Sequence, residues 1–138
     1  MKKLFFGAGS IGFLGLLVFL WAQSVSASST FSDLSQDEFT EFSKQSDTVV
    51  VDVRTAREYR KGHVPGAINL PHRDILSGKI NLDKFSDKNV VFYCHSGVRV
   101  GFVSKYFNKN SFLSQARLFH LQGDFRAWQA RGHPIVIP

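Results

Sequence analysis

The only cysteine of the chain, Cys94, lies where a strand-forming run meets a loop that contains glycine. The residues before it, 89–93, read Asn-Val-Val-Phe-Tyr, and those after it, 95–99, read His-Ser-Gly-Val-Arg. A strand followed by a glycine turn and a helix gathers backbone N–H groups and the positive end of the helix around one point, where an anion is favoured. Such surroundings favour a thiolate or an anionic sulfur adduct, so the pattern predicts that Cys94 is a nucleophile.

Other residue types near Cys94 limit this chemistry. Arg99 is always protonated and adds positive charge, and together with Gly97 it argues against the alternative of a buried, inert thiol. Neighbouring side chains in a loop often point apart, so we interpret His95 as a rim or substrate residue rather than a general base. The other histidines show no ligand-like spacing, and no metal site is predicted; they are His63, His72, His120 and His133.

Alternating strands and helices must position this loop. A capping box, Ser35 to Glu38, predicts the start of the first helix. Strands are expected at 48–53, 89–93 and 118–121, and a turn with a short strand within 63–71. Helices are expected at 36–44, 55–61, 101–107 and 125–130. Residues 73–85 are expected to form a polar, helical passage. The alternation predicts an α/β fold around a mostly parallel sheet, in which functional loops collect at the carboxyl ends of the strands, where Cys94 falls.

Length and charge indicate one domain with a mildly basic surface. We expect residues 1–27 to be a signal peptide, 28–32 a short polar linker and 33–138 the folded domain of the 138-residue chain. Removing residues 1–27 takes away two of the 17 basic residues and none of the 11 acidic ones, so the formal charge falls from +6 to +4. The basic residues are scattered, which suits small anions and gives no indication of nucleic-acid binding. One cysteine allows no internal disulfide.

The N-terminal segment is typical of an export signal. Lys2 and Lys3 precede the apolar residues 4–22, and small residues lead up to Ala27, after which cleavage is expected. An uncleaved membrane anchor formed by residues 4–22 is the alternative, because that stretch is near the length needed to span a bilayer. Either outcome predicts a periplasmic or other extracytoplasmic domain.

Three separated segments carry a family resemblance. The first is Asp52-Val53-Arg54, which leads through Glu58-Tyr59 to the run Gly-His-Val-Pro-Gly-Ala-Ile-Asn-Leu-Pro at 62–71. The second is Tyr93-Cys94 with Gly97-Val98-Arg99. The third is Leu-Gln-Gly-Asp-Phe at 121–125 with Trp128, Gly132 and Pro134. In order and spacing the chain resembles the rhodanese family of sulfurtransferases.

The resemblance implies a rhodanese-like fold, with a central, mostly parallel sheet and helices on both faces. By similarity Cys94 is the catalytic nucleophile, and the residues that bind substrate line the sulfur cradle; they are His95, Ser96, Gly97, Val98 and Arg99. Asp52 and Arg54 are expected to support the site from a neighbouring strand through charged hydrogen bonds. Two departures stand out: Val100 replaces a small hydroxyl residue, which could alter substrate preference, and Asp124 replaces the second glycine of a Gly-Gly pair, at a position expected to lie away from the chemistry.

The expected function is the transfer of sulfane sulfur from a donor such as thiosulfate to a thiol or cyanide through a Cys94 persulfide, without metal or organic cofactor. Its partners would be a small sulfur-containing anion, a thiol acceptor and a partner reductase, with a membrane only through an uncleaved signal. A cysteine phosphatase or arsenate reductase is the enzymatic alternative, although those enzymes resemble one another in placing five residues between cysteine and arginine, where this chain has four. A non-catalytic sulfur carrier or protein-binding module is the other alternative.

Overall fold

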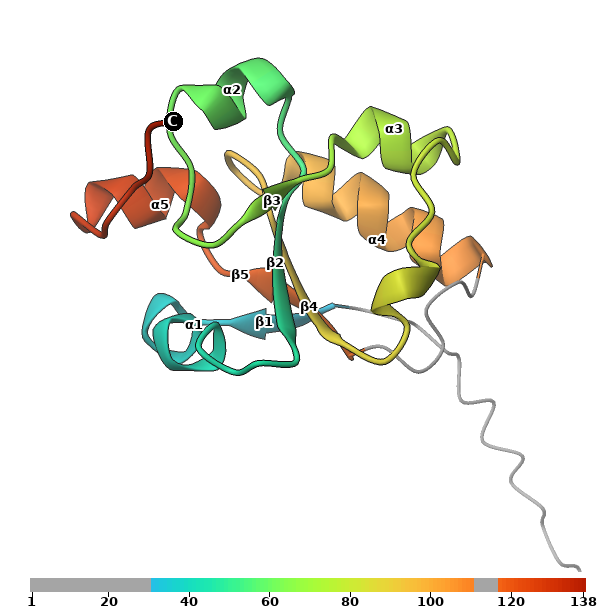
Figure 1. The fold of residues 1–138 in the computed structure, drawn as a ribbon, viewed down its shortest axis with the longest axis horizontal. Coiled ribbons are helices and arrows are strands. Elements are labelled where there is room, and N and C mark those ends of the chain that lie inside the picture. The colour runs from blue at the N-terminus through green and yellow to red at the C-terminus, as the bar shows by residue number, and fades with distance from the viewer. Residues whose placement is uncertain (1–30, 111–116) are drawn as a thin grey trace, which may run out of the picture.

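The computed structural model describes residues 31–110 and 117–138, which form a parallel sheet covered by helices (Figure 1). The five strands lie in the order β1-β5-β4-β2-β3, and every neighbouring pair is parallel. Their bounds are β1 Ser32–Leu34, β2 Thr48–Asp52, β3 Ile68–Asn69, β4 Asn89–Tyr93 and β5 Arg117–Leu121. The α/β fold with a mostly parallel sheet, predicted from the sequence, is confirmed.

Helices cover both faces of the sheet. They are α1 Gln36–Phe42, α2 Ala56–Arg60, α3 His72–Leu76, α4 Val98–Asn110 and α5 Asp124–Ala130, with a 3-10 turn at Asp83–Phe85. The buried side chains of α3 and α4 pack in one apolar cluster and those of α1 and α5 in another. Figure 1 shows α3 and α4 on one side of the strands and α1 and α5 on the other.

The central strand β4 separates the two clusters by simple alternation. Val90 and Phe92 face the cluster that contains α3 and α4, whereas Val91 and Tyr93 face the cluster that contains α1 and α5. Side chains on a strand point to opposite faces in turn, so Cys94, the next residue, returns to the side of α4. The sheet thus delivers the thiol to the helix that follows it in the chain.

One strand was not predicted. β1 has three residues, of which Ser32 and Asp33 are polar. It is recognisable only by its pairing with β5, where Ser32 aligns with Phe119. The predicted linker 28–32 therefore ends earlier than expected, because Phe31 is buried and stacks on Phe92 with ring centroids 5.0 Å apart. Residues 28–30 and the predicted signal peptide, 1–27, lie outside the described residues.

The boundaries of the helices differ from the expectations at their ends. α4 begins at Val98, not at residue 101, and the passage around 73–85 contains α3 and the 3-10 turn rather than one helix. The capping box at Ser35 is present, and α2 has a second one, from Thr55 to Glu58. No helix within 31–110 or 117–138 is both long enough and apolar enough to cross a bilayer.

Replacement of Phe31 tests whether β1 is an integral part of the fold. Phe31→Ala should lower the free energy of unfolding by about 3 kcal/mol, because it leaves a cavity beside Phe92 and Phe107. Phe102→Ala is the matched control, since Phe102 is 50% exposed on α4, and it should change stability by less than about 0.5 kcal/mol. Urea unfolding measures both variants, and equal effects would contradict the docking of β1.

Candidate active site

Cys94 lies at the carboxyl end of β4, under the loop that leads into α4. The Gly97 N–H donates to the Cys94 sulfur at 3.1 Å. Gly97 has a φ of +89°, a conformation that glycine adopts without strain. α4 starts at the next residue, so the positive end of a 13-residue helix also faces the thiol. The predicted arrangement of a thiol under a backbone donor is present.

The thiol itself is less accessible than expected. Gly97 and Arg99 argued against a buried thiol, but Cys94 is 1% exposed and belongs to the apolar cluster beneath α4. The loop residues above it are open to solvent, with His95 and Ser96 exposed and Val98 64% exposed. Val100, where a hydroxyl residue was expected, is buried in the same cluster as Cys94.

The start of α5 holds the Cys94 loop from below. The Cys94 N–H donates to Asp124 Oδ1 at 2.7 Å, and the N–H groups of Phe125 and Arg126 donate to the carbonyls of Cys94 and His95 at 3.0 and 3.2 Å. The expectation that Asp124 lies away from the chemistry is therefore wrong. Its carboxylate bonds the backbone of the predicted nucleophile, a contact across 30 residues of sequence that local patterns do not reveal.

The Arg99 guanidinium forms a bidentate pair with Glu58 of α2, at 2.7 and 2.8 Å. Hydrogen bonding to Arg99 is the main reason that the pKa of Glu58 falls to about 2, and the Thr55 cap adds to it. The pKa of Arg99 is raised, chiefly by its hydrogen bonds to Glu58 and to a smaller degree by interaction with Cys94. Glu58 was not predicted as a site residue, although it lies within the segment that carried the family resemblance.

Asp52 and Arg54 form a buried ion pair at the carboxyl end of β2. Arg54 Nη2 lies 2.6 Å from Asp52 Oδ2, and the side chains are 4% and 0% exposed. Arg54 also donates to the Gly62 carbonyl at 2.7 Å. The expected charged hydrogen bonds of Asp52 to an arginine are present, and the bond from Arg54 to Gly62 joins β2 to the loop after α2. Their part in catalysis stays a prediction.

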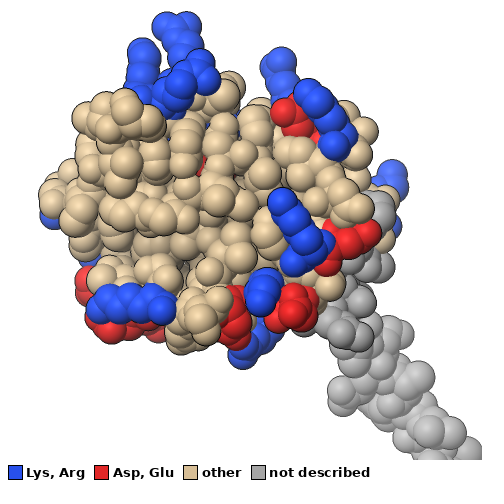
Figure 2. All heavy atoms as spheres, viewed as in Figure 1, with Lys and Arg blue, Asp and Glu red and all other residues tan. Residues whose placement is uncertain are grey.

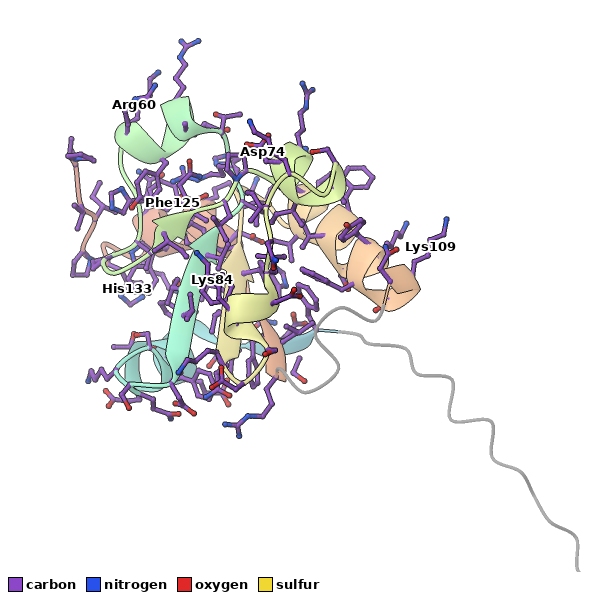
Figure 3. The ribbon with its side chains drawn as sticks, turned by 45° about the vertical axis from the view of Figure 1, so that its right-hand side comes forward. Arg60, Asp74, Lys84, Lys109, Phe125 and His133 are labelled. Atoms are coloured by element: carbon purple, nitrogen blue, oxygen red, sulfur yellow. The ribbon has the colours of Figure 1, made fainter. Side chains whose placement is uncertain are left out.

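The same pair reaches β4 and α5. The Tyr93 hydroxyl donates to Asp52 Oδ2 at 2.8 Å and accepts the Val64 N–H at 3.1 Å. Burial is the main reason that the pKa of Tyr93 is raised, so the phenol stays a neutral donor. The Arg54 guanidinium lies 3.9 Å from the centre of the Phe125 ring, which points from α5 into the molecule (Figure 3). Tyr93, directly before Cys94, is thereby fixed.

Exposed basic side chains surround this edge of the sheet. Figure 2 shows Lys and Arg spheres standing out over α2 and α3, and Arg60 extends outward from α2 in Figure 3. The exposed members are Arg57, Arg60 and Lys61, at α2, and Arg73, on α3. Partly exposed positive charge of this kind raises the local concentration of small anions.

The pairing of Glu58 with Arg99 predicts a pH dependence of stability. Because the pKa of Glu58 is lowered to about 2 in the fold, its contribution is present above its ordinary pKa and is lost as the pH falls towards 2. Glu58→Gln keeps the cap on α2 and should destabilise the protein by about 1 kcal/mol or less at neutral pH, since the pair is partly exposed.

Urea unfolding as a function of pH measures this difference. The difference in the free energy of unfolding between wild type and Glu58→Gln should disappear in acid. Glu41→Gln, which removes an exposed carboxylate on α1, should change the free energy of unfolding only slightly at every pH. A gap for Glu58→Gln that stays constant down to about pH 2 would contradict the assigned pairing.

Comparison with known proteins identifies the family. A family model described as Rhodanese-like domain matches residues 35–131. A sulfurtransferase of Allochromatium vinosum is 35% identical over 92 residues, which cover 67% of this chain and 81% of that protein. A tRNA uridine(34) hydroxylase of Pectobacterium carotovorum is 32% identical over 110 residues, which cover 74% of this chain but 30% of that larger protein.

A solved structure shares the fold. It is a protein of unknown function from Rhodopseudomonas palustris, described as a possible tyrosine phosphatase, with a TM-score of 0.60 and 29% identity over 77% of this chain and 85% of that one. The matches support sulfur transfer as an activity of the family. With a parallel sheet that presents Cys94 at its carboxyl edge and a family match over most of its length, the chain belongs to the rhodanese-like domain family.

Proposed function

We propose that the protein is a sulfurtransferase that carries sulfane sulfur on Cys94. The observation that carries this proposal is the Gly97 N–H on the Cys94 sulfur at 3.1 Å, at the start of a long helix. A backbone donor and a helix N-terminus stabilise an anionic sulfur without a metal ion. The sulfurtransferase relative supports the same chemistry.

The reaction divides into two displacements. The Cys94 thiolate attacks the outer sulfur of thiosulfate, the bond between the two sulfur atoms breaks with its electron pair on sulfite, and a Cys94 persulfide forms. A thiolate or cyanide then attacks the terminal sulfur of the persulfide, which returns Cys94 to the thiolate. Each step is a nucleophilic substitution at sulfur, and no outside oxidant or reductant is consumed.

The position of Arg99 favours sulfur over phosphate as the transferred group. A cysteine phosphatase uses the charge and two N–H groups of its arginine to bind two phosphate oxygens, whereas Glu58 accepts one hydrogen bond from each terminal nitrogen of Arg99 and offsets its charge. The four residues between Cys94 and Arg99 also make a smaller loop than the five of the phosphatases. The site suits one added sulfur atom better than a tetrahedral oxyanion.

Approach of the donor requires the loop to move, because Cys94 is 1% exposed. The basic residues of α2 and α3 would attract a doubly charged donor to this edge of the sheet. The second substrate would be a small thiol or a partner reductase. In keeping with the apolar N-terminal segment, we place the protein outside the cytoplasm, either free or anchored by residues 4–22.

Replacement of the thiol tests the mechanism directly. Incubation of wild type with thiosulfate should add one sulfur atom to Cys94, and cyanide should then remove it as thiocyanate. Cys94→Ser should take up no sulfur and lower the rate of thiocyanate formation by at least about a thousandfold, since the nucleophile is gone. Intact-mass spectrometry and a thiocyanate assay measure the two steps.

Ser86→Ala is the matched control, because Ser86 is an exposed residue at the end of the 3-10 turn, outside the Cys94 loop. It should load sulfur as wild type does. Full transfer by Cys94→Ser would contradict the mechanism. A wild type that loads sulfur but never releases it would indicate a carrier, and phosphatase activity without sulfur loading would support the enzymatic alternative.

Loop length gives a separate prediction on selectivity. One glycine inserted after Ser96 should widen the cradle and shift the Gly97 N–H away from the Cys94 sulfur. Sulfur loading should fall by about tenfold or more, because the loss of one preorganised donor to an anion has an effect of this size. Assays with thiosulfate and with an aryl phosphate measure both activities. An unchanged rate of loading would show that the length of the loop does not determine the chemistry.

A further inference from the structure

An aspartate in a left-handed conformation lies directly beneath the Cys94 loop. Asp124 has a φ of +56° and is 2% exposed. Such a conformation is uncommon outside glycine, although asparagine and aspartate adopt it more often than most residues do. Here Asp124 Oδ1 accepts the Cys94 N–H, and Oδ2 would lie 3.2 Å from a Cβ built on Gly97. The carboxylate therefore accepts a hydrogen bond from the start of the turn that holds the thiol and lies next to the glycine at its other end.

The second carboxylate oxygen of Asp124 meets His120 of β5. Asp124 Oδ2 lies 3.0 Å from His120 Nε2, and Asp33 Oδ1 of the neighbouring strand β1 lies 2.8 Å from His120 Nδ1. A neutral imidazole has one N–H, so one of these contacts would place a ring lone pair against a carboxylate oxygen. The imidazolium donates to both. The geometry thus favours a protonated ring between the two aspartates.

The groups around His120 agree with this assignment. Burial lowers the pKa of His120, but hydrogen bonds and charge interactions with Asp124 and Asp33 outweigh burial and raise it above its usual value. The β4 residue aligned with His120 is the uncharged Phe92, and the ring also faces Gly97. In the loop and the first turn of α4, His95 is exposed and Arg99 is bonded to Glu58.

We propose that Asp124 is a positioning residue which, through its bond to His120, makes the reactivity of the Cys94 thiol depend on the charge of that ring. The inference rests on the proposed role of Cys94 as the nucleophile. While His120 is protonated, its charge balances the Asp124 carboxylate. When the pH rises through the raised pKa of His120, an uncompensated negative charge is left beside the Cys94 backbone and opposes a second negative charge on sulfur.

The test is the rate of alkylation of Cys94 by iodoacetamide as a function of pH. Wild type should show two ionisations, that of the thiol and that of His120. Asp124→Asn can keep the left-handed backbone and the acceptor for the Cys94 N–H, so it should show one ionisation and react about tenfold faster than wild type on the alkaline side of the His120 titration. His120→Gln should show one ionisation and react about tenfold slower on the acidic side.

Opposite changes in rate distinguish this role from a merely structural one. A loosened loop would expose the thiol and speed alkylation in both variants, and that result would overturn the proposal. Asp37→Asn, an exposed carboxylate of α1, is the matched control and should keep both ionisations. NMR titration of the His120 ring in wild type gives a measurement independent of folding of the variants, and a pKa at or below the usual value of about 6.5 would also overturn it.

Alkylation needs no sulfur donor, so this test is separate from that of the proposed function. Loss of sulfur loading with the predicted alkylation profiles would reject sulfur transfer and keep the coupling of Cys94 to His120. Normal sulfur loading with identical profiles for wild type and Asp124→Asn would reject the coupling and keep sulfur transfer.

Discussion

The buried pair of Asp52 and Arg54 is the interaction on which the arrangement of the site depends. Two charges removed from water destabilise a fold unless they are matched by several good hydrogen bonds. Here the matching groups come from four different places: the partner charge, the Gly62 carbonyl, the Tyr93 hydroxyl and the ring of Phe125. Because a shift of Gly62, Tyr93 or Phe125 would take a hydrogen bond or a ring contact from the buried pair, these contacts hold the ends of β2 and β4 and the start of α5 in one relative position.

That rigid frame supports a loop whose charges are balanced in two places. Above the sheet, Arg99 lies close to Cys94 but is neutralised by Glu58. Below the loop, Asp124 lies 3.0 Å from His120, which balances the carboxylate when the ring is protonated. The thiol therefore lies between two opposed pairs of charges, and the Gly97 N–H and the dipole of α4 favour negative charge on its sulfur. A site of this kind responds strongly to the loss of a single charge.

Much of the fold could be predicted because its signals are local. The β-branched run of β2 and the apolar run of β4 show buried parallel strands without any knowledge of their neighbours. β1 could not be found in the same way: it has three residues, and only its pairing with β5 and the burial of Phe31 make it a strand. An edge strand of this length is determined by hydrogen bonding to its neighbour and not by the intrinsic strand propensity of its residues.

The site also combines residues that a local sequence pattern predicts with residues that only the tertiary structure brings in. Cys94, Gly97 and Arg99 share one short segment, and their chemistry is visible in sequence. Glu58 lies 41 residues from Arg99, and Asp124 lies 30 residues from Cys94. Both carboxylates reach the loop only because parallel strands bring their carboxyl ends to one edge of the sheet. A sequence pattern places the nucleophile, but the residues that modulate it come from tertiary structure.

The direction of β1 determines at which side of the sheet the described chain begins. β1 is parallel to β5, so it begins at the same side of the sheet as the other strands, whereas Cys94 lies at the opposite, carboxyl side. Phe31 stacks on Phe92 and fixes β1 at that side of the sheet. The start of β1 and the Cys94 loop therefore lie at opposite ends of the parallel strands, and a substrate that reaches Cys94 approaches the side of the sheet away from Phe31.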